Sequence, residues 1–199
     1  MNQPARLAVF ISGNGTNAEA IFRYFQGHPH IRVVLVLSNN PDAYGLQRAE
    51  KFNIPVRVFN KVDFRESDTV EQWLWEAGVT HIILAGFLWL IPVHLIRAFP
   101  NRIINIHPAL LPKFGGKGMY GIKVHEAVKT AGETHSGITI HEIDEKYDEG
   151  KILFQSTIEI TPHDSVEQIA ERVQQLEHQH YPRIIEEWVT HSITRKAHK

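Results

Sequence analysis

The chain has 199 residues, of which 43% are hydrophobic, and its 21 Lys and Arg against 22 Asp and Glu give a formal net charge of -1. This length and apolar content are enough for one sizeable core, so we expect a single domain over residues 1–199. The balanced charge supplies no basic field for a nucleic-acid backbone, and no nucleic-acid partner is expected. The sequence contains no cysteine, which excludes disulfides, thiolate zinc sites and a cysteine nucleophile.

The N-terminal apolar run "LAVFI", residues 7–11, is too short for a secretory signal or a membrane span. We therefore expect a soluble cytoplasmic protein with no membrane partner.

Short β-branched runs then alternate with segments of helical length. The expected strands are residues 6–12, 31–38, 56–59, 81–87 and 103–107, and the expected helices are 17–27, 43–53, 63–78 and 92–99. The strand segments are almost continuously apolar, as in sheets that are covered by helices on both faces. The pattern predicts an α/β fold with a doubly wound, mostly parallel, Rossmann-like sheet.

The last third of the chain has a different pattern. A helical segment at 123–132 is followed by two strand-like segments, 136–144 and 151–160, with an acidic turn at 145–150 between them. This arrangement predicts an antiparallel hairpin added at the sheet edge. A closing helix is expected to start at Asp164 or Ser165.

The loop "SGNGTNAEA", residues 12–20, follows the first expected strand and opens the first helix. Gly13 and Gly15 allow a tight turn, and the backbone N–H groups of Gly15, Thr16 and Asn17 would face an anion at the helix N-terminus. We interpret the loop as a phosphate site. The alternative is a plain strand-to-helix turn in which the same residues serve as caps.

The spacing of Gly13, Gly15 and Ala18 also fits a dinucleotide-binding pattern. That pattern expects an acidic residue about 20 positions later, at the end of the second strand. Here the strand ends in "LSNNPD", and its only acid, Asp42, lies beyond a proline. A single phosphate is favoured, and a nicotinamide-dependent oxidoreductase is kept as an alternative.

Polar residues at the end of the fifth strand are the candidate catalytic groups. Asn105 and His107 are two residues apart, so they share one strand face, and Pro108 ends the strand. An amide and an imidazolium side by side can stabilise one developing oxyanion. Asp148, in the turn between the late strands, would raise the pKa of a nearby histidine. The alternatives are a core histidine, a capping asparagine and a surface aspartate, as in a non-catalytic binding module.

Glu177 is a further candidate, because it lies on an apolar stripe of the last helix. It follows Val173 by four residues, so it falls on the stripe rather than opposite it. A carboxylate there is either a ligand-binding group or the partner of an arginine such as Arg172.

Six segments occur in the order and spacing typical of the phosphoribosylglycinamide formyltransferase family. They are "SGNGTN" (12–17), "AGF" (85–87), "NIHPALLPKF" (105–114), "HSGITIHEID" (135–144), "DEGKIL" (148–153) and "EHQHYP" (177–182). The resemblance covers residues 7–188. The third segment alone is typical of the wider formyltransferase superfamily, whereas the first and last favour the glycinamide ribonucleotide branch.

The resemblance implies a purine-biosynthesis (IMP pathway) enzyme. It would transfer a formyl group from 10-formyltetrahydrofolate, its cosubstrate, to the amine of glycinamide ribonucleotide, giving N-formylglycinamide ribonucleotide and tetrahydrofolate. The implied partners are these small molecules, the chain being a monomer or homodimer, and no metal is required. Another folate-dependent formyltransferase or a formyltetrahydrofolate deformylase is the alternative.

The resemblance also implies residue roles. Asn105 and His107 would stabilise the tetrahedral oxyanion, while Asp148 would keep the histidine charged and help to move the amine proton. The implied ribonucleotide contacts are Gly15, Thr16, Asn17, Gln174 and Glu177, the implied folate contacts are Arg65, Leu88, Trp89, Leu90, Ile91 and Asn105, and His141 would lie behind the transferred formyl group.

Two features depart from the more compact family members. The glycine-rich segment 114–121 is several residues longer, which suggests a mobile lid near the formyl site. Trp89 stands where a polar residue is frequent, so the folate contacts around it are less constrained by the resemblance. None of the 13 histidines forms an H-E-x-x-H motif, and no metal site is expected.

Overall fold

The structure is a computed structural model that describes residues 4–146 and 148–196. Residues 1–3 and 197–199, at the ends of the expected domain, and residue 147, in the expected acidic turn, lie outside the described residues.

A seven-stranded sheet forms the centre of the fold, with the strand order β3-β2-β1-β4-β5-β6-β7. The strands are β1 (Ala5–Ile11), β2 (Ile31–Ser38), β3 (Val56–Val58), β4 (His81–Leu84), β5 (Ile103–His107), β6 (His135–Glu142) and β7 (Ile152–Glu159). The pairings from β3 through β5 are parallel, whereas β5–β6 and β6–β7 are antiparallel. The expected mostly parallel sheet with a late antiparallel hairpin is confirmed.

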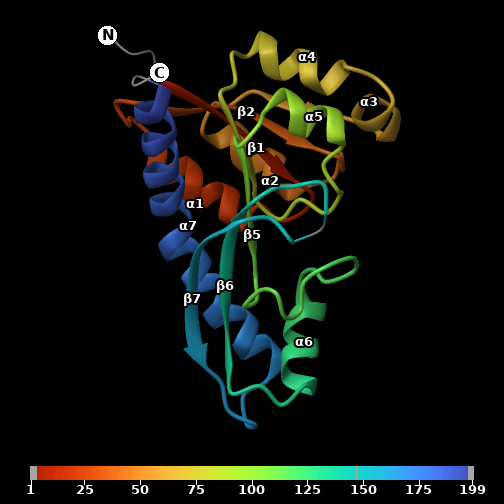
Figure 1. The fold of residues 1–199 in the computed structure, drawn as a ribbon, viewed down its shortest axis with the longest axis vertical. Coiled ribbons are helices and arrows are strands. Elements are labelled where there is room, and N and C mark those ends of the chain that lie inside the picture. The colour runs from red at the N-terminus through yellow and green to blue at the C-terminus, as the bar shows by residue number, and fades with distance from the viewer. Residues whose placement is uncertain (1–3, 147, 197–199) are drawn as a thin grey trace.

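Helices cover both faces of the sheet. The helices are α1 (Thr16–Phe25), α2 (Tyr44–Lys51), α3 (Lys61–Arg65), α4 (Thr69–Glu76), α5 (Val93–Ala98), α6 (Ile122–Thr130) and α7 (Val166–Lys196). Apolar residues of α1, α2, α6 and α7 form one core with the sheet, and those of α3, α4 and α5 form a second core. Figure 1 shows α3, α4 and α5 together at one end of the molecule, and α7 running along most of its length. Both faces of the sheet are therefore shielded from solvent, which explains why the strands are continuously apolar.

Two expected elements differ from the structure by more than two residues at a boundary. The expected strand 81–87 ends at Leu84, because the chain turns at Gly86, where φ is +74°. The expected helix 63–78 is two helices: Asn60 and Asp63 form a capping box that starts α3 early, and the chain leaves the helix after Arg65 before α4 begins at Thr69. The polar segment 66–68 therefore separates two short helices where periodicity had suggested one.

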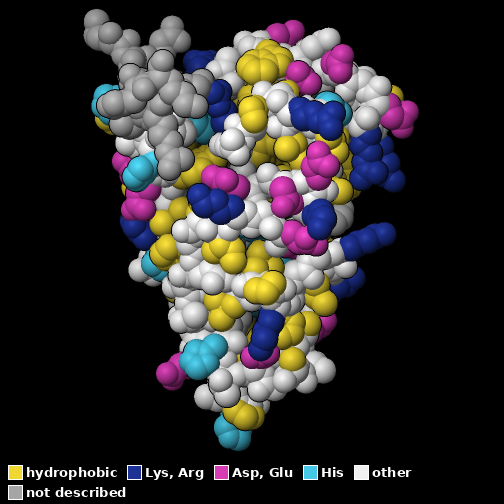
Figure 2. Space-filling view, viewed as in Figure 1, with side chains coloured by type: hydrophobic (Ala, Val, Ile, Leu, Met, Phe, Trp, Pro, Cys, Tyr) yellow, Lys and Arg dark blue, Asp and Glu magenta, His cyan; other side chains and the backbone are white. Residues whose placement is uncertain are grey.

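The surface agrees with the balanced composition. Figure 2 shows acidic and basic side chains interspersed on the face drawn, with fewer charges toward its narrow end. No helix among residues 4–146 and 148–196 is long and apolar enough to cross a membrane.

The order of the strands reverses between β1 and β4. From β1 the chain moves outward through β2 to β3, and it then returns to form β4 on the other side of β1. At such a switch point the loops that follow the two strands diverge and leave a crevice at their carboxyl ends. The sheet topology thus fixes where a ligand can bind.

Candidate active site

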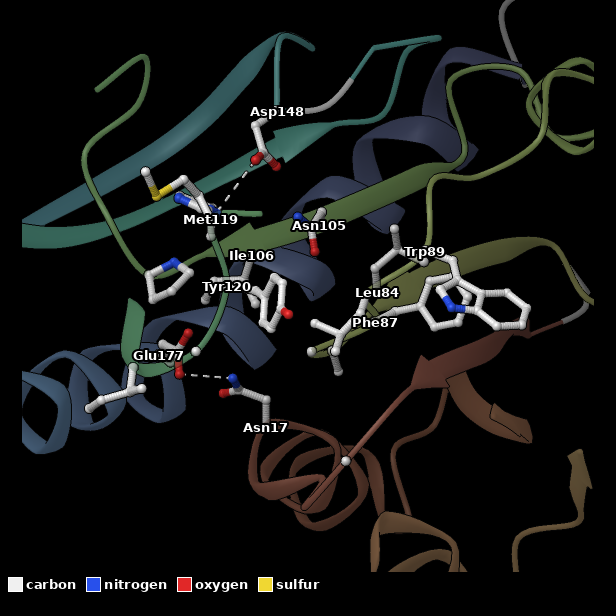
Figure 3. A pocket seen from close by; sticks show the side chains of 18 of the residues that line it. Asn17, Leu84, Phe87, Trp89, Asn105, Ile106, Met119, Tyr120, Asp148 and Glu177 are labelled. Atoms are coloured by element: carbon white, nitrogen blue, oxygen red, sulfur yellow. Dashed lines mark hydrogen bonds and ion pairs between the residues drawn. The ribbon is translucent and has the colours of Figure 1, made fainter. Parts of the chain in front are cut away.

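A cavity of about 620 Å³ opens at this switch point. Three segments that follow strand ends line it: 13–17 after β1, 84–91 from the end of β4, and 105–108 at the end of β5. Residues 116–122 and one face of α7 complete the wall (Figure 3). The predicted ribonucleotide and catalytic residues all line this cavity, as do residues 88–91 of the predicted folate set.

The glycine loop forms one end of the cavity. Gly15 adopts φ +72° as the residue before α1, and a Cβ at this position would lie 2.6 Å from the Cα of Gly45. A side chain at Gly15 is therefore excluded by both conformation and space. At the start of α1, Thr16 accepts a hydrogen bond from Gln174 Nε2 at 3.1 Å, which joins the loop to α7.

Glu177 lies next to this loop, on the inner face of α7. Its side chain is buried, with a residue exposure of 9%, and one carboxylate oxygen accepts a hydrogen bond from Asn17 Nδ2 at 2.9 Å. Burial raises the pKa of Glu177 to about 7, although the Asn17 hydrogen bond acts in the opposite direction. Arg172 instead pairs with Asp164 at 3.5 Å, so the alternative of a Glu177–Arg172 pair is wrong.

Asn105, His107 and Asp148 converge along one side of the cavity. His107 Nδ1 lies 3.7 Å from one carboxylate oxygen of Asp148, and His141 Nε2 lies 3.5 Å from the other. The amide nitrogen of Asn105 is 3.3 Å from the same His141 nitrogen. The convergence that a non-catalytic binding module would not need is therefore present.

The hydrogen bonds of the two histidines fix their tautomers. His107 Nε2 lies 2.8 Å from the carbonyl of Phe114, and His141 Nδ1 lies 3.0 Å from the carbonyl of Glu142. A carbonyl only accepts, so each of these nitrogens carries a proton. Nδ1 of His107 is left to face Asp148. Nε2 of His141 lies between the Asn105 amide and an Asp148 oxygen, so at most one of the two Asn105 amide hydrogens is used there.

Burial and charge act against each other at His107. Burial lowers the pKa of His107 below its ordinary value, and the opposing effects of Asp148 and the Phe114 carbonyl do not reverse this. The expectation that Asp148 raises the histidine pKa is thus right in direction, but the net pKa is lowered. His107 is neutral at pH 7 before substrate binds.

The site holds Asp148 in its ionised form. Burial would raise its pKa, but the neighbouring imidazoles of His141 and His107 and a 2.9 Å hydrogen bond from the Gly116 N–H together bring the pKa below its ordinary value. The residue also adopts φ +56°, a left-handed conformation that is uncommon outside glycine. Strain of this kind persists where the surrounding contacts over-determine a functional position.

The wall opposite the glycine loop is apolar. Leu84, Phe87, Leu88, Trp89 and Ile91 line it, and Figure 3 shows the labelled side chains of Leu84, Phe87 and Trp89 grouped together at this end. Such a wall suits a flat, partly apolar ring system. The predicted folate residue Arg65 does not line the cavity; it is exposed, and its guanidinium lies 6.0 Å from the ring centre of Trp89.

Two groups of residues that line the cavity were not predicted individually from the sequence. All residues from 116 to 122 line the cavity, and Met119 and Tyr120 point into it in Figure 3. His125, on α6, also lines it; burial, together with the neighbouring His107, lowers its pKa to about 4. The glycine-rich composition signalled the first group as a lid, whereas no sequence signal distinguishes His125 from the other histidines.

Within the described part of the chain, no group of three or more His, Asp or Glu side chains is placed to hold a metal ion. The prediction that the chemistry needs no metal stays a prediction.

Comparison with known proteins identifies the class. The sequence model of the family described as "Formyl transferase" matches residues 5–185. The chain therefore belongs to the formyl transferase family, and the resemblance seen in its sequence motifs is confirmed.

Individual relatives point to one branch of this family. The chain is 39% identical to the phosphoribosylglycinamide formyltransferase of Bacillus subtilis, over 92% of this chain and 93% of that protein. It is 46% identical to the chloroplastic phosphoribosylglycinamide formyltransferase of Arabidopsis thaliana. This match covers 90% of this chain but only 64% of that relative, so the chain spans less than two thirds of its length. The crystal structure of glycinamide ribonucleotide transformylase 1 from Symbiobacterium toebii superposes with a TM-score of 0.83 at 34% identity, covering 93% and 87% of the two chains.

The buried carboxylate of Glu177 predicts a pH-dependent stability difference. A pKa raised from 4.5 to about 7 means that folding penalises the ionised form, so stability falls as pH rises through this window. Glu177→Gln should match the wild type near pH 5 and exceed its free energy of unfolding at pH 8 by on the order of 3 kcal/mol. Urea denaturation at the two pH values measures this.

Glu186→Gln, also on α7, is the matched control, because hydrogen bonds from Tyr24 and His28 lower the pKa of Glu186. That variant should lose stability at pH 8 or stay unchanged. An equal stability difference at both pH values in Glu177→Gln would show that the buried carboxyl does not titrate in this range.

Proposed function

We propose that this protein transfers the formyl group of 10-formyltetrahydrofolate to the amine of glycinamide ribonucleotide, giving N-formylglycinamide ribonucleotide and tetrahydrofolate, a step of purine biosynthesis. One observation carries the proposal: a cavity that joins a phosphate-type glycine loop to the group Asn105, His107 and Asp148. The names of the relatives support the same reaction. The cytoplasm remains the predicted compartment.

The reaction needs an amine nucleophile, a group that takes its proton and donors for an oxyanion. When the neutral amine attacks the formyl carbon, the C=O bond opens and negative charge develops on the formyl oxygen. The free amide hydrogen of Asn105 donates to that oxygen. His107 Nδ1 faces Asp148 at 3.7 Å, and both side chains line the cavity together with Asn105.

Proton transfer then falls to His107 and Asp148. The amine nitrogen becomes positively charged as it attacks, and its proton passes to the Asp148–His107 pair, directly or through water. The lowered pKa of His107 makes its Nδ1 an available acceptor before the reaction, and the Asp148 carboxylate stabilises the imidazolium once it forms. The protonated ring then donates to the oxyanion and afterwards to the leaving folate nitrogen as the C–N bond breaks.

The two ends of the cavity would bind the two substrates. We assign the ribonucleotide phosphate to the backbone N–H groups of Gly15, Thr16 and Asn17, with Gln174 beside them. Glu177, held by Asn17, would accept hydrogen bonds from the sugar hydroxyls or the amine. The apolar wall around Trp89 would take the folate ring, with Arg65 outside it available to the carboxylates of the folate tail.

A spectrophotometric assay of tetrahydrofolate release tests the function. Release should require glycinamide ribonucleotide and should match the formation of its N-formyl product. Equal release with water alone would instead identify a deformylase, and release driven by another amine would identify a different formyltransferase.

Asn105→Ala tests the oxyanion role. Loss of one oxyanion donor lowers turnover by about 10²- to 10³-fold, and substrate binding should change little because the donor acts mainly in the transition state. Steady-state kcat and both KM values measure the effect. If kcat falls by less than about 3-fold, which is outside the range expected for an oxyanion donor, Asn105 does not stabilise the oxyanion.

Asp148→Asn tests the coupled pair. Without the carboxylate, the pKa of His107 should fall further, so the limb of the pH–rate profile that reports the histidine should move to lower pH. The double variant with His107→Ala should cost much less than the product of the two single losses, because the residues act as a unit. Losses that simply multiply would contradict the coupling.

A further inference from the structure

If the proposed function is right, the end of the cavity formed by the glycine loop and α7 binds a phosphate without a cationic side chain from either segment. The cavity residues that come from the glycine loop and α7 are Gly13, Asn14, Gly15, Thr16, Asn17, Ala170, Val173, Gln174 and Glu177, whereas the two lysines of the cavity, Lys117 and Lys146, come from other segments. None of the residues from the glycine loop and α7 carries a positive charge, and one is an acid. From these residues a phosphate dianion would therefore receive only backbone N–H groups, the α1 dipole and neutral side chains such as Gln174.

Arg48, on α2, lies directly behind the loop. Its Nε donates to the backbone carbonyl of Asn14 at 2.9 Å, and its Nη2 donates to the Asn14 side-chain oxygen, also at 2.9 Å. Nη1 pairs with Glu19 of α1. One guanidinium thus joins the middle of the loop, the first turn of α1 and its own helix, and its side chain is only 21% exposed.

The same face of α2 fits against the loop without a gap. The N–H of Gly45 donates to the carbonyl of Gly13 at 3.1 Å, and a Cβ at Gly45 would lie 3.1 Å from the Cα of Gly15. Arg48 stands one turn further along the helix, where its guanidinium lies 4.8 Å from the ring centre of Tyr44. The packing and the hydrogen bonds together hold the loop in one conformation.

The local charge is positive. Glu19 is shared by two arginines, Arg48 and Arg23, the latter through the 2.5 Å contact of its Nη2. Two positive charges against one negative leave this three-residue cluster with a net positive charge; Glu177, the acid of the cavity lining, is not part of the cluster. Arg23 is 69% exposed and hydrogen-bonds to Glu19, whereas Arg48 is 21% exposed and also contacts the loop through Asn14.

We propose that Arg48 is the positioning residue and counter-charge of the phosphate loop: its bidentate hold on Asn14 aims the loop N–H groups at the phosphate, and its charge attracts the dianion from behind. It acts through the loop and does not enter the cavity. Its contribution is to the binding of the phosphorylated substrate and not to the formyl-transfer step.

Binding of ribose 5-phosphate, with ribose as the comparison ligand, tests the proposal by isothermal titration calorimetry. Arg48→Gln should weaken ribose 5-phosphate binding by about 10-fold or more, as expected for removing a unit charge several ångströms from a dianion. Arg48→Lys should recover part of the loss, because it restores the charge but not the planar two-point hold. Arg23→Gln, the matched control, should stay within about 2-fold of wild type because exposed pairs contribute little.

Kinetics separate positioning from general damage. In Arg48→Gln the KM for glycinamide ribonucleotide should rise while kcat and the KM for the folate stay near wild type. Glu19→Gln gives an independent readout that keeps the Arg48–Asn14 contacts: it removes a negative charge beside the loop and should leave ribose 5-phosphate binding as tight or tighter at low salt.

Several results would overturn the proposal: unchanged ribose 5-phosphate binding in Arg48→Gln, an equal loss in Arg23→Gln, an equal rise in the KM of both substrates, or no ribose 5-phosphate binding by the wild type. Failure of the proposed function has a different signature. The phosphate would then bind in an Arg48-dependent manner, but no formyl transfer to glycinamide ribonucleotide would occur.

Discussion

The site depends on one half-buried carboxylate. Asp148 lies between His107 and His141, receives the Gly116 N–H, and stays ionised although burial opposes its charge. A buried charge without partners would be neutralised or expelled, so the two histidines and the glycine-rich segment must keep their places around it. His141 in turn fixes the amide of Asn105. The catalytic group is therefore a single hydrogen-bonded unit, and its orientation is decided by the position of this carboxylate.

The fold places that unit where a second substrate can reach it. β5 carries Asn105 and His107, and antiparallel β6 brings His141 directly opposite Asn105 in the sheet register. The reversal of strand order between β1 and β4 opens the crevice beside them. α7 then closes the far side, because the apolar stripe that packs it on the sheet also carries Glu177 to the glycine loop. A mostly parallel sheet with an antiparallel addition thus builds one cavity with a polar end and an apolar end.

Much of this arrangement could be predicted from the sequence, because the signals are local. Continuous apolar runs mark the buried strands, and strand-end polar residues such as Asn105 and His107 mark the ligand-binding edge. The position of Asp148 opposite them depends on the hairpin, which the sequence also signals. The net pKa of His107 could not be predicted, since it is the difference between burial and charge in three dimensions. No sequence motif marks Arg48, because its proposed role depends on the packing of α2 against a loop more than 30 residues earlier in the chain.

The most direct test of the account is a pH titration of Asp148 and His107 in the free protein, monitored by NMR. The sample carries ¹³C in the aspartate carboxyls and ¹⁵N in the histidine rings. The account predicts that Asp148 titrates below an unpaired aspartate, that His107 titrates below an unpaired histidine, and that His107 carries its neutral-state proton on Nε2. An Asp148 that titrates above the ordinary aspartate range, or a neutral His107 protonated on Nδ1, would contradict it.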